Sequence, residues 1–518
     1  MGLTDHDHPI LLYALCFLIP YALFNLYRHI TLHPLRRYPG PLLAKVTDLY
    51  ALRYALSTDL HRQTYLDHLK YGSVVRHGPN KLVFNSVQAL HDIHHANRLT
   101  KSRVYLASVQ GPNTLNLFNA IDPEFHRTRR QLVAPVVNDK SMRIFEPTMI
   151  EQVDIFIEKL RPSSQGSESQ YVDMTARCKY LGMDIVGLLA FGYNLKLQTD
   201  DPNRFIIETL RISNYFLNLQ MQQPIMRHFK FDLLLYARSI LKGKSYLATI
   251  AKMIEQRMSQ PDDGQHDFYA FVANEMKTSR TGKVWGSEIW AEAIFFLSAG
   301  GDTISTALSA LFFYLSRSTQ SYQRLAAEIR SSFATGDEIK GSQLANCRYL
   351  RACIDETLRM SPPLPGTLWR EEMSKGHDNT QALVIDGHAV PPGTQVGVNL
   401  YALHHNEQYF TDPFKFYPER WLPECSNMAN RKAFAPFLVG PRSCAGKVMA
   451  YLEASLVIAK TLWYFDFEVA PGKLGDIGSS KPPGTRHITA ESQEYRLQDI
   501  VVSSHQGPYL QFHLRTKY

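Results

Sequence analysis

The sequence predicts a single large domain that is mostly α-helical with minor β-sheets, an α+β arrangement dominated by helices. The main observation is that apolar residues recur at helical spacing over six stretches: 145–160, 172–190, 203–220, 232–257, 287–316 and 318–331. In addition, no repeat and no low-complexity linker long enough to separate domains follows residue 45. Residues 46–518 are therefore expected to fold as one unit.

Short runs with β-like alternation accompany the helices. Val74–Arg76 and Lys81–Phe84 are separated by a turn-forming segment, so they predict a hairpin near the start of the domain. Asp499–Val502 and Tyr509–Phe512 predict a second hairpin near its end.

An apolar segment lies near the N-terminus. Pro9–Tyr27 is interrupted only by Asn25 and Pro20, and its roughly nineteen residues can span a bilayer as a helix. A cleaved signal peptide is the alternative, but no basic residue precedes the segment and no clear small-residue cleavage site follows it. We therefore expect an uncleaved, single-pass membrane anchor within residues 1–30.

The charges around this segment predict its orientation. Two aspartates precede it, whereas Arg28, Arg36 and Arg37 follow it, so the positive-inside rule leaves the rest of the chain in the cytosol. Residues 31–45 contain Tyr38-Pro39-Gly40-Pro41, whose prolines cannot continue the anchor helix. This segment is expected to form a stiff hinge.

The composition narrows the function classes. The six cysteines include no CxxC pair and no regular spacing, which argues against a disulfide framework or a zinc site and favours a reducing compartment. The net charge is +8, but basic and acidic residues are interleaved along most of the chain, so nucleic-acid binding is not expected. An acidic protein partner remains open.

The informative chemistry lies in Phe437-Leu438-Val439-Gly440-Pro441-Arg442-Ser443-Cys444-Ala445-Gly446, which precedes an apolar-periodic helix. The start of a helix favours a thiolate over a thiol, which suits either a metal ligand or a nucleophile. A phosphate-binding loop is excluded, because the spacing is wrong and Val448 replaces the required hydroxyl residue. A nucleophile would need a base, and no one histidine stands out, so both roles stay open at this point.

This loop resembles the haem-binding loop Phe-x-x-Gly-x-Arg-x-Cys-x-Gly of the cytochrome P450 family at every fixed position. The resemblance implies a cytochrome P450-like fold and haem b, with Cys444 as the axial thiolate ligand of the iron. It further implies that Arg442 pairs with a haem propionate and that Phe437 packs beside the sulfur.

Two other segments resemble elements of the same family. Glu356-Thr357-Leu358-Arg359 is similar to its Glu-x-x-Arg element. Pro418-Glu419-Arg420-Trp421 is similar to Pro-Glu-Arg-Phe, with Trp421 replacing the phenylalanine. By this resemblance Glu356, Arg359 and Arg420 form a buried structural network and are not catalytic.

The predicted helix over 287–316 contains Ala299-Gly300-Gly301-Asp302-Thr303-Ile304, which is similar to the family pattern Ala-Gly-x-Asp-Thr-Thr except at Ile304. Each mid-helix glycine costs about 1 kcal/mol relative to alanine, which we expect a helix to tolerate where it passes close to a flat cofactor. The resemblance implies that Asp302 and Thr303 deliver protons during oxygen activation. The alternative for Thr303 is a hydrogen bond back to the preceding turn. Ile304 removes a possible second hydroxyl from this region.

Haem carboxylates need cationic partners. His126-Arg127-Thr128-Arg129-Arg130 resembles the family's Trp-x-x-x-Arg element, with His126 in the place of the tryptophan, so His126 and Arg130 are expected to bind the propionates. Arg370 matches the family's other propionate arginine. Each could instead be a surface cation. Arg127 and Arg129 are expected to face solvent, where they could help dock an acidic reductase.

No dinucleotide-binding GxGxxG fingerprint lies between a strand-like run and a helix, so the electrons must come from another protein. The resemblance implies an endoplasmic-reticulum enzyme that uses NADPH only indirectly, through NADPH-cytochrome P450 reductase. The segments Arg37–Leu42, His77–Asn80 and Lys101–Tyr105 look like fungal members involved in secondary metabolism. They imply a lipophilic small-molecule substrate.

The substrate pocket is expected from the resemblance to involve Tyr105–Asn119, Phe295, Phe296, Ala299 and Leu364–Leu368. The expected reaction is insertion of one oxygen atom of O2, or a desaturation or epoxidation. A haem-thiolate isomerase or dehydratase that needs no external electrons is an alternative, as is a non-catalytic haem-binding membrane protein. The Asp302–Thr303 pair favours the monooxygenase.

Overall fold

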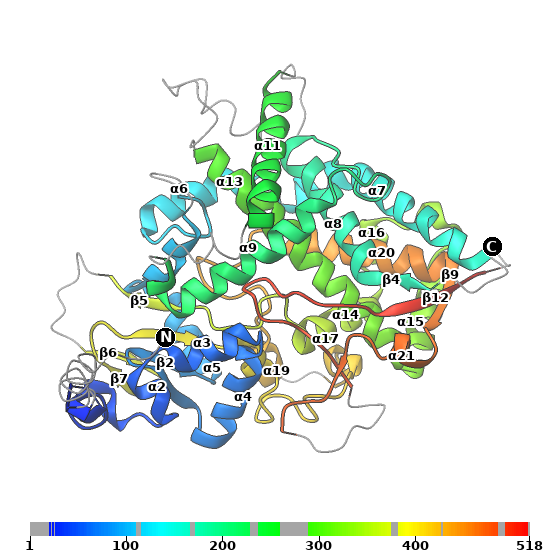
Figure 1. The fold of residues 1–518 in the computed structure, drawn as a ribbon. Coiled ribbons are helices and arrows are strands. Elements are labelled where there is room, and N and C mark those ends of the chain that lie inside the picture. The colour runs from blue at the N-terminus through cyan, green and yellow to red at the C-terminus, as the bar shows by residue number, and fades with distance from the viewer. Residues whose placement is uncertain are drawn as a thin grey trace, which may run out of the picture.

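The computed structural model is mostly helical, with four small sheets among the residues that it describes (Figure 1). These are residues 20–21, 23–24, 26–109, 115–165, 171–227, 237–259, 288–373, 382–425, 428–484 and 493–515. The α-helices are α2 (Leu42–Val46), α3 (Leu49–Leu56), α4 (Leu60–Tyr71), α5 (Val87–His95), α6 (Pro123–Val133), α7 (Asp139–Gln165), α8 (Met174–Phe191), α9 (Phe205–Gln222), α11 (Ala237–Ser259), α13 (Glu288–Phe296), α14 (Thr303–Arg317), α15 (Thr319–Ser332), α16 (Gly341–Leu344), α17 (Arg348–Met360), α18 (Leu400–His404), α19 (Met428–Ala433), α20 (Lys447–Tyr464) and α21 (Gly472–Gly475).

Shorter helical segments and the strands complete the described fold. The π-helical segments are η1 (Arg28–Leu32) and η5 (Leu297–Asp302), and the 3-10 segments are η2 (Pro34–Arg37), η3 (Arg103–Ser108), η4 (Pro224–Arg227), η6 (Gly336–Glu338) and η7 (Pro418–Trp421). The strands are β1 (Val74–Gly78), β2 (Lys81–Phe84), β3 (Leu99–Lys101), β4 (Val172–Asp173), β5 (Arg370–Glu372), β6 (Leu383–Ile385), β7 (His388–Val390), β8 (Gln395–Val398), β9 (Phe465–Val469), β10 (Ser479–Ser480), β11 (Glu494–Tyr495) and β12 (Tyr509–Leu514).

The helical core confirms the predicted α-helical stretches. They correspond to α7, α8, α9, α11, α15 and the continuous run α13–η5–α14, although residues 232–236 lie outside the described part of the chain. The run Trp290–Arg317 is long and apolar enough to cross a membrane. However, 61% of its most apolar window is buried inside the molecule, and α14 packs against α8, α17 and α20. Its hydrophobicity is therefore that of a core helix.

The five-stranded sheet has the order β1-β2-β8-β5-β3 and lies near the N-terminal helices, on the left of Figure 1. The predicted hairpin β1–β2 is confirmed, with Val74 opposite Phe84. β2 pairs in parallel with β8, and β3 pairs antiparallel with β5, so that Lys101 lies opposite Arg370. This register brings together two cations that are far apart in the sequence.

The second predicted hairpin is wrong. β12 pairs with β9 and β4, on the right of Figure 1, and not with Asp499–Val502. The latter segment has no strand, because its backbone bonds elsewhere: the Asp499 carbonyl accepts from the side chain of Asn218 at 2.8 Å, and Val501 has φ +80°. The sequence predicts the hairpin because Ile500 and Val502, two residues apart and both buried, give the same apolar alternation as a strand.

The N-terminal segment is attached to β1 through Arg76. This side chain is fully buried, and its guanidinium donates to the carbonyls of His29 (3.0 Å), Lys45 (3.1 Å) and Pro79 (2.9 Å). At Gly40 a Cβ would lie 2.4 Å from the Arg76 carbonyl oxygen, which only glycine permits. The segment predicted as a Pro/Gly hinge, residues 31–45, thus packs closely on β1. The predicted anchor within residues 1–30 lies largely outside the described residues.

A buried ion cluster joins α17 to η7. Glu356 accepts hydrogen bonds from Arg359 (2.9 Å), from Arg420 (3.0 Å), from the indole of Trp421 (3.0 Å) and from the Tyr417 amide (3.0 Å). Burial alone would raise the pKa of Glu356, but the two arginines overcome that effect and lower it. The structural network expected for Glu356, Arg359 and Arg420 is confirmed. The indole at Trp421 adds a donor that a phenylalanine would lack.

Glu356→Gln should lower the free energy of unfolding by about 3–5 kcal/mol, because it leaves two buried arginines without a carboxylate. Glu208→Gln is the matched control: Glu208 also pairs with an arginine three residues later, but both side chains are 42% exposed. Its cost should be about 0.5 kcal/mol or less. Equal midpoints for the two variants in urea denaturation would contradict the importance of the Glu356 network.

Candidate functional site

A cavity of about 660 Å³ lies between the loop that precedes α20 and the helices α8, α9, α13 and α14. Cys444 and Phe437 line it from the loop side, and Thr303 and Ile304 line it from the opposite helix. The predicted pocket residues that line it are Tyr105, Ala107, Ser108, Val109, Asn116, Leu117, Phe118, Phe295, Phe296, Ala299, Leu364 and Leu368. The sequence prediction missed the contributions of α8 and α9, because no local motif marks them: Val186, Leu189, Ala190, Leu210, Ser213, Asn214, Phe216, Leu217 and Gln220.

The cysteine loop is held by its own backbone. The Cys444 amide donates to the Phe437 carbonyl at 2.8 Å, and the Ser443 amide donates to the Gly440 carbonyl at 3.0 Å. Leu438 and Gly440 have φ values of +59° and +78°. A Cβ at Gly440 would lie 2.2 Å from the His94 carbonyl oxygen, so the loop packs directly on the end of α5. The predicted loop before a helix is confirmed, and it brings Cys444 to the cavity wall.

The Cys444 thiol is accessible from the cavity but otherwise surrounded by protein. Burial raises its pKa, and this effect outweighs the Gly446 amide, Arg130 and Lys447, which favour the thiolate. Desolvation thus opposes the thiolate that the position before a helix favours. A bound metal ion would deprotonate the thiol, so the ligand role fits this environment better than that of a free nucleophile.

Five basic side chains line the same cavity: Lys101, His126, Arg130, Arg370 and Arg442. Arg442 donates to the carbonyls of Ala120 and Ile121 and to the Thr100 hydroxyl. Arg130 donates to the Ser443 carbonyl at 2.6 Å. The structure thus brings together His126, Arg130, Arg370 and Arg442, the cations predicted for the haem carboxylates.

Lys101 joins this cluster although the sequence prediction did not assign it a role. Its ammonium donates to the Leu117 and Phe118 carbonyls at 3.2 and 2.5 Å, and it lies directly across the β3–β5 pair from Arg370. A lysine at the end of a short strand resembles any surface lysine in sequence. Only the cross-strand register reveals that it is 9% exposed and faces the cavity.

In the described residues the cationic cluster carries more positive than negative charge. Burial and then Arg370 and Arg442 lower the pKa of Lys101, while Glu292 opposes them, and Asp122 favours the charged form of Arg442. Burial and then Arg442 and Lys101 lower the pKa of His126 to about 3, and burial and Arg370 lower that of Arg442 to about 10. Like charges that face each other across a sheet are destabilising unless an anion separates them. A ligand with two carboxylates and a metal for Cys444, such as haem, fits this donor set.

Phe437 also lies in the cavity wall. Its ring centroid is 5.2 Å from that of Tyr451, and both residues line the cavity together with Cys444. Phe437 thus lines the same cavity as Cys444, and its packing beside the sulfur stays a prediction.

Thr303 and Asp302 lie differently with respect to the cavity. Thr303 lines it, and its hydroxyl donates to the Ala299 carbonyl at 2.6 Å, which is the alternative considered from the sequence. Asp302 is 6% exposed and lies outside the described cavity lining. Burial raises its pKa to about 6, and Lys179 on α8 opposes that rise. The structure therefore brings only Thr303 of this pair to the cavity surface.

The two adjacent glycines allow close packing on α8. A Cβ at Gly300 would lie 2.5 Å from Cγ2 of Val186, and one at Gly301 would lie 2.5 Å from the sulfur of Met183. The explanation from the sequence, which invoked only a flat cofactor, was therefore incomplete. Helix-to-helix contact requires these glycines, and the same region forms the π-helical segment η5.

Arg129 does not face solvent, as the sequence analysis had expected. It is 7% exposed, and its guanidinium lies 4.9 Å from the ring centre of Phe125, one turn earlier on α6. Arg127 is exposed and pairs with Glu124. The prediction is thus correct for Arg127 and wrong for Arg129, because the helix turns Arg129 to the face that it shares with Phe125.

Gly440→Ala should destabilise the protein far more than Gly387→Ala. Gly387 has a similar φ of +74° but no atom near its Cβ position, so its substitution should cost about 1–2 kcal/mol. Gly440→Ala should cost about 1–3 kcal/mol more, because the added methyl overlaps the His94 carbonyl. The comparison is made by urea denaturation of both variants, and equal costs would show that the loop does not depend on this contact.

Comparison with known proteins agrees with the geometry of the site. A family model described as Cytochrome P450 matches residues 41–485. Cytochrome P450 monooxygenase poxM of Penicillium oxalicum is 34% identical, over 96% of this chain and 94% of its own length. The corresponding values are 33%, 93% and 93% for Cytochrome P450 monooxygenase AKT7 of Alternaria alternata. They are 31%, 97% and 97% for Cytochrome P450 monooxygenase apf7 of Gibberella fujikuroi. The chain therefore belongs to the cytochrome P450 monooxygenase family.

Proposed function

We propose that this chain uses haem b to insert one oxygen atom of O2 into a lipophilic secondary metabolite, or to desaturate or epoxidise it. The observation that carries the proposal is the presence of one cysteine thiol and a cluster of five basic side chains, buried or half-buried, in the same cavity. Haem b, when bound, supplies the chemistry of oxygen activation. The similar proteins from Penicillium oxalicum, Alternaria alternata and Gibberella fujikuroi are named monooxygenases, which supports the reaction class.

In this proposal Cys444 binds the iron as a thiolate, while the cations bind the two propionates. Arg442, Arg370 and Arg130 supply permanent charge. Burial and the neighbouring cations lower the pKa of His126 to about 3, so its neutral ring supplies a hydrogen-bond donor. Lys101 completes the set, because a propionate would supply the negative charge that favours its ammonium form in this buried position. Lys101, Arg130 and Arg442 are positioned before the cofactor binds by hydrogen bonds to the backbone, Arg370 by its place on β5, and His126 by its buried place on α6.

Proton delivery falls to Asp302 and Thr303 in this proposal. The pKa of Asp302, raised by burial to about 6, allows the carboxyl group to exchange protons near neutral pH. The Thr303 hydroxyl donates to the Ala299 carbonyl, so its oxygen is oriented by the helix and can accept a hydrogen bond from the cavity side. Asp302, which does not line the cavity, would supply the protons. The Thr303 hydroxyl, at the cavity surface, would orient them.

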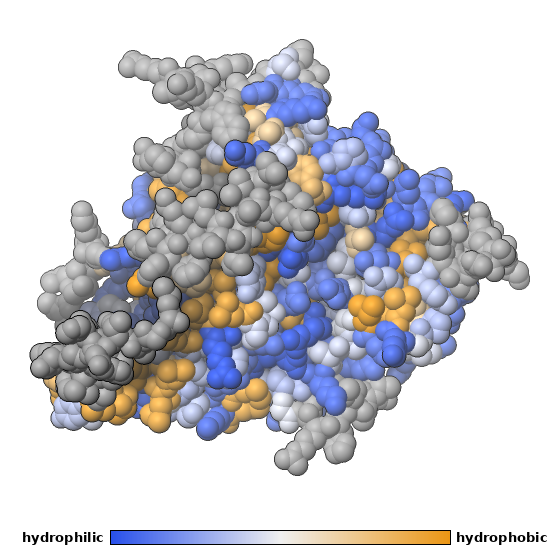
Figure 2. Space-filling view, viewed as in Figure 1, coloured by the Kyte–Doolittle hydropathy of each residue, from blue (hydrophilic) through white to orange (hydrophobic). Residues whose placement is uncertain are grey.

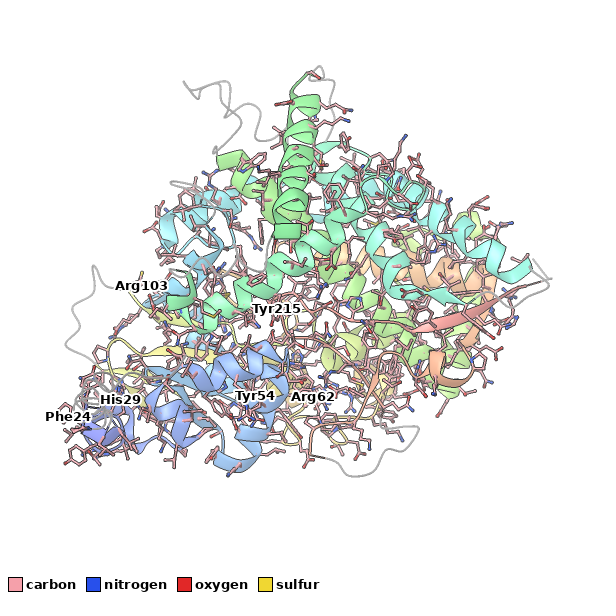
Figure 3. All side chains as sticks on the ribbon, viewed as in Figure 1. Phe24, His29, Tyr54, Arg62, Arg103 and Tyr215 are labelled. Atoms are coloured by element: carbon pink, nitrogen blue, oxygen red, sulfur yellow. The ribbon has the colours of Figure 1, made fainter. Side chains whose placement is uncertain are left out.

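A membrane location is supported by exposed apolar side chains in the described part of the N-terminal segment. Phe24 and His29 lie at the lower-left edge of the molecule in Figure 3, and Figure 2 shows hydrophobic surface in the same corner, where α2 lies. Several large side chains of this region are at least half exposed: Tyr21, Leu23, Phe24, Tyr27, Leu32 and Leu42. Such a patch fits insertion of residues 1–30 into the endoplasmic-reticulum membrane with the catalytic domain in the cytosol.

Electrons would come from NADPH-cytochrome P450 reductase on the same membrane. The exposed Lys447 follows the cysteine loop directly, and the exposed Arg127 lies on α6, whose Arg130 contacts that loop. An acidic reductase surface could therefore dock near the thiolate. Steady consumption of NADPH with reductase and substrate distinguishes this function from an isomerase, a dehydratase or a carrier.

Cys444→Ala should remove the absorption band of the reduced carbonyl complex at about 450 nm, which reports thiolate ligation. Turnover with reductase and NADPH should be lost with it. Cys425→Ala is the control, because Cys425 is exposed and away from the cavity. An unchanged band in Cys444→Ala would rule out this ligand.

Thr303→Ala should retain the carbonyl band but lower the product formed per NADPH by about 10- to 100-fold, with hydrogen peroxide released instead. Thr306→Val is the control, because its hydroxyl also bonds back to the helix, to the Asp302 carbonyl at 3.0 Å, but does not line the described cavity. A wild-type ratio of product to NADPH in Thr303→Ala would contradict the proton-delivery role.

Deletion of residues 1–27 should release the folded haem protein into the soluble fraction. The deletion stops there so that the His29 carbonyl can still accept from Arg76. The measurement is the share of the carbonyl band in the supernatant after membranes are sedimented. If the truncated chain stays with the membranes, the addition of Leu42→Ser tests whether α2 holds it; full retention of both would contradict a single N-terminal anchor.

A further inference from the structure

A polar pair lies in the otherwise apolar part of the cavity that faces α9. The amide nitrogen of Asn214, on α9, donates to the Ser298 hydroxyl oxygen in η5 at 3.3 Å. Both residues line the cavity, and Asn214 is only 8% exposed. The pair therefore joins two helices that are far apart in the sequence and presents polar atoms to the interior.

The pair has unused hydrogen-bonding capacity. Among the described residues, no group donates to the amide oxygen of Asn214, and none accepts from the Ser298 hydroxyl. Because the Asn214 side chain is otherwise enclosed, its free amide oxygen is suited to a ligand that provides a donor. Together the two side chains offer one acceptor and one donor to the cavity.

The other polar groups of the lining are already engaged or belong elsewhere. Asn116 bonds to the Ala291 carbonyl and to the amides of Phe118 and Asn119, and the hydroxyls of Thr303 and Tyr246 donate to helix carbonyls. The five basic residues form the cluster assigned to carboxylates. Ser213 and Gln220 are more exposed than Asn214. Apart from the buried Tyr105, whose hydroxyl lies beside Arg370 in the cationic cluster, the buried Asn214 and the partly exposed Ser298 are the neutral groups of the described lining left to recognise a substrate.

We propose that Asn214 and Ser298 bind a hydroxyl or carbonyl oxygen of the substrate, which is therefore an apolar skeleton that already carries one oxygen function. A hydroxyl group satisfies both side chains, because it donates to the Asn214 oxygen and accepts from Ser298. A ketone satisfies Ser298 alone. The inference rests on the proposed function and specifies its substrate class.

The position of the pair also bears on where the substrate reacts. Ser298 lies five residues before Thr303, more than one turn earlier along the same helical run. A substrate held at Ser298 therefore presents to the Thr303 region a carbon several bonds away from the bound oxygen. Oxidation is expected at a site distinct from the existing oxygen function.

The test uses full-length, haem-loaded protein in detergent and three matched probes: cyclododecanol, cyclododecanone and cyclododecane. Dissociation constants are read from the displacement of the haem absorption band on titration. The wild type should bind the alcohol most tightly and the hydrocarbon least, with each hydrogen bond worth about two- to tenfold in affinity. Asn214→Leu should reduce the preference for the alcohol over the ketone, and Ser298→Ala should remove the preference for the ketone over the hydrocarbon.

Thr209→Val is the matched control. Thr209 lies on the same helix and is 7% exposed, but its hydroxyl bonds back to the Phe205 carbonyl and it does not line the described cavity. Its affinity ratios should equal those of the wild type. The carbonyl band at about 450 nm checks that each variant is folded and loaded. Should Asn214→Leu fail that check, Asn214→Ser and Ser298→Ala carry the test.

Two negative outcomes are distinguishable. Unchanged affinity ratios in Asn214→Leu or Asn214→Ser and in Ser298→Ala would show that the pair only joins α9 to η5, and would overturn the inference while the haem assignment stands. Absence of the carbonyl band in the wild type would instead overturn the proposed function itself.

Discussion

The placement of Cys444 depends on the buried carboxylate of Glu356. Through Arg359, which donates to the His404 carbonyl at 2.9 Å, the Glu356 network fixes the end of α18. The ring of His404 then accepts from the Ala435 amide at 3.1 Å, and Ala435 accepts from Leu438 at the start of the cysteine loop. Trp421 adds a parallel route, because its indole donates to Glu356 while its ring packs on Phe434, with centroids 4.5 Å apart. The buried Glu356 network thus orients the cysteine loop, although no residue of the network belongs to that loop.

The cavity shows the opposite electrostatic situation. The Glu356 carboxylate is held directly by two arginines. In contrast, Lys101, Arg130, Arg370 and Arg442 share one cavity, where Glu292 acts on Lys101 and Asp122 on Arg442 without matching the cluster's positive charge in the described residues. The same effect of burial that raises the pKa of Cys444 lowers those of the cations. A metal bound to the thiolate and two carboxylates near the cations would relieve both costs together. Cofactor binding is therefore expected to stabilise the folded chain as well as to equip it for catalysis.

The π-helical segment η5 decides which side chains reach the cavity. It packs on α8 so closely that Gly300 and Gly301 leave no room for a Cβ. The wider turn places Ser298 and Thr303 in the cavity wall, whereas Asp302 lies behind it near Lys179. One local change in helical geometry thus separates the side chains that line the cavity from the Asp302 carboxyl group, which does not reach it.

The amino-acid sequence by itself determined the helices of the core, the β1–β2 hairpin and the cysteine loop, because each depends on a local period, a short turn or a contiguous motif. Tertiary structure alone decided that Lys101 faces Arg370, that Arg129 is buried and that β12 pairs with β9 instead of with Asp499–Val502. It also decided that Asn214 meets Ser298 in the cavity wall. These features depend on strand register, on desolvation and on contacts between helices distant in the chain, none of which a local pattern of residues contains.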